Sequence, residues 1–314
     1  MPSRKRTSTS GRAPFQDASD KIVSQLAGLL ADREFESPEA LDAYLETLSG
    51  GGPLPVRAVA TNEDRAMDLL DQAQGTASQK KRLTLVRQAI ALDPNNADAY
   101  VMLALDAPTR DETMTLLAEA VRAGERAIPD GVETLVAEGA IWLAHESRPY
   151  MRARATLAME LWRIGDRQSA IDELWELLRL NPGDNQGLRY VLLGWLLSAG
   201  SLAAIERLLA QYPDDGSATW QFDRVLHAFR ATGDCVASRK QLESAVRLNP
   251  HVVPMLLGLV PLPESIPDYI GFGDETEAAS YVADALLRWS EDPEAIEWVA
   301  AHARKGAKAR GRRR

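Results

Sequence analysis

The 314-residue chain has a single cysteine, Cys235, and no apolar run that approaches the roughly 20 residues needed to cross a bilayer. One cysteine excludes an intrachain disulfide and fits a reducing compartment. The first 14 residues are followed by apolar residues that Ser24 and Gln25 interrupt, which is not the unbroken stretch of a secretory signal. We therefore expect a cytoplasmic protein with no membrane segment.

Histidines are also few, and the four of them stand alone along the sequence: His145, His227, His251 and His302. There is no HExxH or CxxC, so no pair of ligands has the spacing of a metal site. Phosphate-binding loops are missing too, because SGGGP at 49–53 lacks a following Lys-Ser/Thr and GFGDE at 271–275 lacks a third glycine. We expect neither a metal nor another cofactor.

No GxSxG motif is present, which leaves Cys235 as the one nucleophile to consider. Cys235 follows the Gly233-Asp234 turn and begins a helix, where a thiol pKa can be lowered. The alternative, which we favour, is a small apolar residue in a helix-packing slot. From the sequence we therefore expect a protein that is not an enzyme.

The charge is unevenly distributed along the chain. Eleven of the 36 basic residues lie in residues 1–12 and 304–314, which contain no acid, so residues 13–303 hold 25 basic residues against 45 acids, about −20 in net charge. The body is therefore acidic and both ends are basic. We expect residues 1–14 to be a disordered basic tail and residues 304–314 to be a second basic tail.

Residues 15–48 predict an N-terminal pair of helices. The first has an apolar stripe at helical spacing, formed by Ile22, Val23, Leu26, Leu29 and Leu30. The second begins at Ser37-Pro38-Glu39, an N-cap followed by a first-turn proline and an acid. Residues 49–60 start with SGGGPLP, which indicates a Gly/Pro linker.

The rest of the chain carries an internal repeat. Three similar phrases end a helix with Asn or Asp followed by proline, at Pro94, Pro182 and Pro250. Pro182 and Pro250 are 68 residues apart, twice 34. Turn glycines recur between the expected helices at Gly165, Gly200 and Gly233, with spacings of 35 and 33. The pattern predicts helix pairs at residues 63–96, 97–124, 151–184, 185–217 and 219–252.

A period of 34 residues, with two helices and a closing proline, resembles the tetratricopeptide repeat (TPR). The phrases LDPNNADAYVMLA, AVRAGERAI, ESRPYMRARATLA, LLRLNPGDNQGLRYVLL and NPHVVPMLLG also resemble bacterial TPR proteins related to the suppression-of-tumorigenicity family. The resemblance implies an all-α fold, a TPR-type right-handed helical solenoid over residues 61–303. It implies no established chemistry.

Two stretches depart from the repeat. Residues 125–149 break the period, and VETLVAEGAIWLAHE within them predicts an inserted helix. Residues 253–303 predict a strap and cap, because clustered prolines prevent a continuous helix before two last helices near 275–289 and 293–303. Since capping helices cover the exposed end of a repeat array, we expect a monomer.

The TPR resemblance places the first helix of each unit along a concave groove that binds extended peptides. The residues mapped to this groove are Arg152, Met159, Arg163, Asn185, Gln186, Arg189, Tyr190, Trp220, Asp223 and His227. Arginines recognise carboxylates through a bidentate fork, so an acidic or C-terminal peptide of a partner protein is the expected ligand. The sequence thus favours a non-catalytic scaffold or adaptor.

Two alternatives stay open at this point. Arg148, Arg152, Arg154 and Arg189 form a predicted basic patch, but they could instead pair with neighbouring acids and hold adjacent repeats in register. The protein could also associate with nucleic acid through its basic termini, since Arg304–Arg314 can contact phosphates without reading base sequence.

Overall fold

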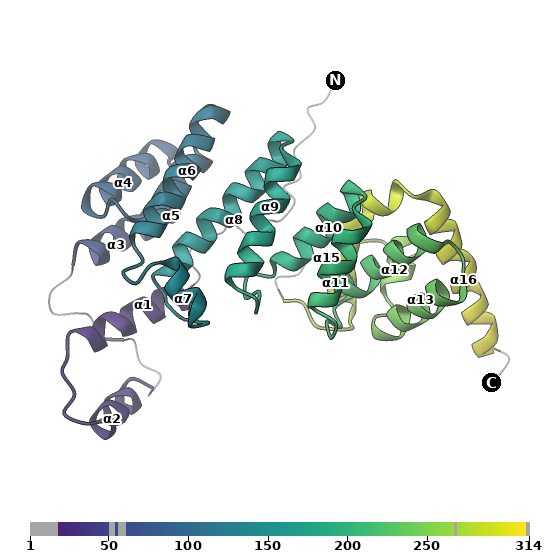
Figure 1. Ribbon diagram of the computed structural model, residues 1–314, viewed down its shortest axis with the longest axis horizontal. Helices are drawn as coiled ribbons and strands as arrows, with labels where there is room; N and C mark the ends of the chain where they lie inside the picture. Colours follow the sequence, from purple (N-terminus) through teal and green to yellow (C-terminus); the bar gives the residue numbers. More distant parts are fainter. Residues whose placement is uncertain (1–17, 50–53, 56–60, 267–268, 312–314) are drawn as a thin grey trace. The chain divides into compact units, whose positions relative to one another are not determined.

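The computed structural model of the protein describes residues 18–49, 54–55, 61–266 and 269–311 (Figure 1). Within these ranges the chain forms 16 helices and no strand, which confirms the all-α class. They divide into two compact units, residues 18–185 and residues 186–311. The predicted basic head at 1–14 and most of the linker at 49–60 lie outside the described residues.

The unit of residues 18–185 contains nine described helices. Three pairs, α3 with α4, α5 with α6 and α8 with α9, pack side by side along their lengths and are joined by short turns (Figure 1). The bounds of the nine are α1 Ala18–Ala31, α2 Pro38–Leu48, α3 Asn62–Gln74, α4 Gln79–Leu92, α5 Ala97–Leu105, α6 Arg110–Arg126, α7 Val132–Ala137, α8 Ser147–Ile164 and α9 Arg167–Leu180.

The ends of these helices follow from local side-chain chemistry. Ser37 accepts a hydrogen bond from the amide of Ala40 and Pro38 occupies the first turn of α2, as predicted. Asp93, Asn181 and Asn249 take non-helical backbone angles at the ends of α4, α9 and α13 (Val236–Leu248), each directly before its proline. The helix-ending role of the repeated proline phrases is confirmed.

The unit of residues 186–311 contains the other seven described helices. Their bounds are α10 Leu188–Ala199, α11 Leu202–Gln211, α12 Ala218–Thr232, α13 Val236–Leu248, α14 Val252–Leu256, α15 Glu275–Ser290 and α16 Pro293–Gly311. We call residues 257–274, which connect α14 to α15, the strap. Its described residues are non-helical, as the prolines predict.

One hydrophobic core joins α12 to the helices that follow it. Phe222, Val225 and Leu226 of α12 pack with Tyr281, Val282 and Trp289 of α15. The same cluster includes apolar residues of α13, α14 and α16. Helix α15 also packs on α10, so α12 is covered by neighbours on several sides.

The structure corrects two sequence predictions in the irregular stretches. The inserted helix expected over VETLVAEGAIWLAHE is only six residues long, because α7 ends at Ala137 and Gly139 then takes a positive φ of 66°. Helix α8 starts at Ser147, four residues before the predicted unit 151–184, and tolerates Pro149 because a first-turn proline costs no helical hydrogen bond.

The last helix also differs from the prediction. Helix α16 runs from Pro293 to Gly311, whereas we expected a helix at 293–303 followed by a separate basic tail at 304–314. Residues 312–314 lie outside the described part of the chain. The helical backbone therefore continues through most of the basic segment.

Candidate functional site

Arg152 of α8, the first residue mapped to the groove, is buried and ion-paired. Its Nε donates to Oδ1 of Asp98 at 3.0 Å and its Nη2 donates to Oδ2 at 2.7 Å. Both side chains are less than a tenth exposed, so the bidentate pair joins α5 to α8 inside the core. Removing either partner would leave a buried charge, which makes Arg152 a structural residue.

Met159, Arg163 and Asn185 are the other predicted groove residues in the unit of residues 18–185. Met159 and Arg163 are exposed and lie one turn apart on α8, and Arg163 pairs with Glu160 on the same helix. Asn185 is exposed in the segment that follows α9. These three side chains are accessible, and they are not among the residues that line the pocket described below.

Three predicted groove residues on α12 are buried, which corrects their assignment to an open surface. Trp220 and Asp223 are 0% exposed and His227 is 9% exposed. Asp223 accepts hydrogen bonds from Tyr281 and Arg288 of α15. The face of α12 that the repeat pattern assigns to a groove is thus covered by α15 and the core.

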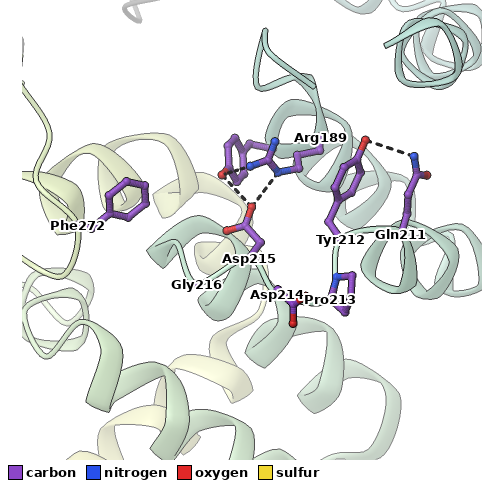
Figure 2. Close-up of a pocket in the computed structure, with 9 residues that line it drawn as sticks. Arg189, Gln211, Tyr212, Pro213, Asp214, Asp215, Gly216 and Phe272 are labelled. Carbon is purple, nitrogen blue, oxygen red and sulfur yellow. Dashed lines mark hydrogen bonds and ion pairs between the residues drawn. The ribbon is translucent and has the colours of Figure 1, made fainter. Parts of the chain in front are cut away.

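Gln186, Arg189 and Tyr190 are half-buried at the start of the second unit. The structure brings Arg189 and Tyr190 together at a pocket of about 440 Å³. The pocket is lined by Arg189, Tyr190, Gln211, Tyr212, Pro213, Asp214, Asp215, Gly216 and Phe272 (Figure 2). These residues come from the start of α10, the end of α11, the turn before α12 and the strap.

An ordered polar network holds one wall of this pocket. Oδ2 of Asp215 accepts hydrogen bonds from Nε of Arg189 and from the hydroxyl of Tyr190, both at 2.8 Å. Oδ1 accepts from the amide of Ser217 at 2.9 Å. Burial raises the pKa of Asp215, but the hydrogen bonds from Ser217, Arg189 and Tyr190 together outweigh it, so its pKa lies below the ordinary value.

Aromatic rings frame the Arg189 guanidinium. Its central carbon lies 4.3 Å from the ring centre of Tyr190 and 5.2 Å from that of Tyr212. Both rings make edge-to-face contacts with the buried ring of Trp220. The tyrosines are therefore fixed from behind, and the pocket wall is preorganised.

Across the pocket from Tyr212 lies Phe272 of the strap (Figure 2). Phe272 is 84% exposed, and the strap also exposes Tyr269 and Ile270. Exposed apolar side chains beside a pocket mark a surface that a partner can cover. This rim distinguishes the pocket from an internal packing defect.

Sequence reasoning missed most of these lining residues. The Tyr212-Pro213 break was visible, and YPDDG has the composition of a turn, but a turn alone does not indicate a pocket. GFGDE was considered as a phosphate loop and instead supplies Phe272. The sequence offered only a weak signal, an aromatic residue in a segment rich in proline and glycine.

The predicted basic patch is engaged within the protein. Arg154 pairs with Glu173 at 2.8 Å, and Nε of Arg148 donates to the carbonyl of Trp142 at 3.1 Å. Arg152 and Arg189 bind Asp98 and Asp215, as described above. These contacts support the alternative in which the arginines pair with neighbouring groups and hold the helices together, rather than bind a ligand.

The described residues hold neither a cluster of metal ligands nor a membrane-spanning helix. No cluster of three or more His, Cys, Asp or Glu side chains there has the arrangement to hold a metal ion. No helix in the described part is long and apolar enough to cross a membrane.

No protein-family model matches the chain, and no curated protein matches its sequence.

Proposed function

We propose that this protein is a TPR-like helical scaffold that binds an extended segment of a partner protein without catalysing a reaction. The successive helix pairs, the recurring turn glycines and the closing prolines support the repeat assignment. In this proposal the protein acts in the cytoplasm as a monomer, in keeping with its single cysteine.

The pocket at the α10–α11 end of the second unit is the observation that carries the proposal. Its volume of about 440 Å³ is within the usual size of ligand sites, roughly 300–1,000 Å³. It combines apolar walls with a few fixed polar groups, and Phe272 extends the apolar surface to the rim. A peptide side chain could enter the pocket while the peptide backbone runs along the strap.

The pocket offers a sharper test than the predicted groove arginines. Reversing the charge of Arg152 would break a buried ion pair and unfold the protein rather than probe binding. Gly216 lines the pocket, its φ is not in the left-handed region, and a Cβ built on it meets no atom within 4 Å. Gly216→Leu should therefore fill the pocket without straining the fold.

The experiment compares proteins captured from native extract by four full-length forms: wild type, Gly216→Leu, Phe272→Ala and Leu287→Ala. Leu287 is the matched control for Phe272, since it is 72% exposed on α15 and does not line the pocket. We expect one set of partners that wild type and Leu287→Ala retain and the two pocket variants lose. Circular dichroism establishes that all four forms are folded.

A fifth form, lacking residues 304–314, tests association with nucleic acid. The proposal predicts that this truncation keeps the partners. If capture instead depends on the basic segment, with nucleic acid in the eluate and a steep loss at high salt, the scaffold proposal fails and tethering to nucleic acid replaces it.

A further inference from the structure

We propose that the pocket of the second unit selects a cationic side chain, an arginine of an extended peptide, rather than the acidic or C-terminal peptide suggested by the sequence. The inference rests on the proposed function and adds the class of ligand. It follows from the charges already satisfied in the pocket, the aromatic walls and the charge of the strap.

An incoming carboxylate has no free positive partner in the pocket wall. Arg189, the one cation among the lining residues, already binds the Asp215 carboxylate. Asp215 also accepts from Tyr190 and from the Ser217 amide, so displacing it would break three hydrogen bonds. An anionic ligand would have to compete with this network at close range, which disfavours acidic peptides.

A second carboxylate in the pocket is available to a cation. Asp214 is exposed, and in the described part of the chain it makes no hydrogen bond or ion pair. The lining thus holds two carboxylates and one guanidinium, a net charge of −1. An arginine side chain entering the pocket would meet Asp214 without displacing an existing partner.

The aromatic walls suit a guanidinium. The pocket already stacks one, since the Arg189 guanidinium lies against the rings of Tyr190 and Tyr212 at 4.3 and 5.2 Å. Phe272 supplies another ring face across the pocket (Figure 2), and it is 84% exposed. Planar guanidinium groups stack on such faces better than other charged side chains do.

The charge of the surrounding segment points the same way. The strap, residues 257–274, contains three acids and no lysine or arginine. A basic peptide that runs along the strap therefore meets attractive charges beyond the pocket itself. The surface complements a cationic segment in both its aromatic and its electrostatic character.

The test uses defined peptides and the full-length protein. The probe is N-acetylated, C-amidated Gly-Pro-Arg-Pro-Gly, compared with the same peptide carrying citrulline, the uncharged analogue of arginine, and with one carrying glutamate. Ligand-observed NMR titration reads the weak affinities of such short peptides. We expect the arginine peptide to bind about fivefold or more tightly than the citrulline peptide, and the glutamate peptide to bind least.

Two variants place the effect at the pocket. Asp214→Asn should weaken the arginine peptide by about three- to tenfold and leave the citrulline peptide unchanged, because only the charged side chain loses a partner. Glu243→Gln is the matched control, since Glu243 is an exposed acid on α13 outside the pocket lining. It should leave both peptides unaffected.

The outcomes separate the inference from the proposed function. Equal binding of the arginine and citrulline peptides, lost in Gly216→Leu, would overturn the selection of a cation and leave a peptide pocket in place. If the peptides bind equally well to wild type and Gly216→Leu, or if none binds, the pocket is not the peptide site and both proposals fail. Binding of the glutamate peptide above the arginine peptide would reverse the assignment of ligand charge.

Discussion

At the scale of single residues, Asp223 is a carboxylate that the fold buries completely. Its Oδ1 accepts from the Tyr281 hydroxyl at 2.9 Å, and its Oδ2 accepts from Nη2 of Arg288 at 3.1 Å. Breaking a buried ion pair strands its partner's charge, so we expect Asp223→Ala to lower the free energy of unfolding by about 3–5 kcal/mol. Urea denaturation followed by circular dichroism measures this loss.

Asp284 provides the matched control on the same guanidinium. Its Oδ2 lies 3.0 Å from Nη1 of Arg288, but its side chain is 75% exposed. We expect Asp284→Ala to cost less than about 1 kcal/mol, because solvent screens an exposed pair. Equal losses in the two variants would show that burial is not what makes Asp223 important.

Cys235 is the second residue with a distinct prediction. Its side chain caps the N-terminus of α13 and is half-buried, so it does not fill the interior packing slot favoured from sequence. Hydrogen bonding with the Thr232 hydroxyl, and hydrogen bonds from the amide and hydroxyl of Ser238, lower the pKa of the thiol to about 7.

The thiolate of Cys235 therefore forms as the pH rises through about 7. We expect the rate of alkylation by iodoacetamide to rise with a midpoint near this pH, and the midpoint to move upward in Thr232→Val. Because the chain has a single cysteine, the rate reports this site alone. A midpoint at the ordinary thiol value of about 8.5 in the native protein would contradict the assigned hydrogen bonds.

At the scale of elements, Glu277 of α15 ties three segments together. Its Oε1 accepts from the amide of Ala218, the first residue of α12, at 2.8 Å. Its Oε2 accepts from the side-chain amide of Asn249, after α13, at 2.9 Å and from the amide of Gly273 in the strap at 2.8 Å. The carboxylate also lies at the positive end of the α12 dipole.

Replacing Glu277 by alanine should leave these donors unpaired in a buried position. We expect a loss of about 2–4 kcal/mol in unfolding free energy, together with faster hydrogen exchange at Gly273 in the strap. Glu275→Ala is the control, since its side chain is 74% exposed, and it should cost about 0.5 kcal/mol. Unchanged exchange in the strap would mean that other contacts hold it.

At the scale of the whole molecule, the two compact units have separate cores. Leu117 packs in a cluster of α5, α6 and α8, whereas Leu226 packs in the cluster of α12 to α16. Each side chain is almost fully buried. A core that belongs to one unit should give that unit its own local stability.

Leucine-to-alanine changes test this independence. We expect Leu117→Ala and Leu226→Ala each to cost about 2–5 kcal/mol locally. Hydrogen exchange measured by mass spectrometry should accelerate in residues 61–185 for the first variant and in residues 186–302 for the second. Acceleration spread evenly over both units would show that the chain unfolds as one cooperative body.

Much of the helical layout was predictable because it depends on neighbours in sequence. Ser37 with Pro38, the turn glycines such as Gly165, and the proline after Asn181 act within a single turn of backbone. In the repeat at 185–217, the Tyr212-Pro213 pair likewise ends α11 after 10 residues, against 14 in α9. Such local effects do not require knowledge of the fold.

The candidate site was largely not predictable, because its residues meet only through tertiary structure. Of the pocket residues, Arg189 and Tyr190 were identified, while Asp214 and Phe272 come from segments without a recognisable motif. Asp223 was assigned to a groove because the repeat pattern does not say which face of α12 a later helix covers.

By itself, the sequence therefore determined the helical class, the helix ends that a cap, a turn glycine or a proline marks, and the acidic body between basic ends. Tertiary structure alone decided that α15 buries one face of α12, that the arginines pair with acids, and that the strap places Phe272 at a pocket beside Arg189. The physical reason is range: caps and turns act over a few residues, whereas burial and pocket formation depend on contacts between segments up to about 80 residues apart.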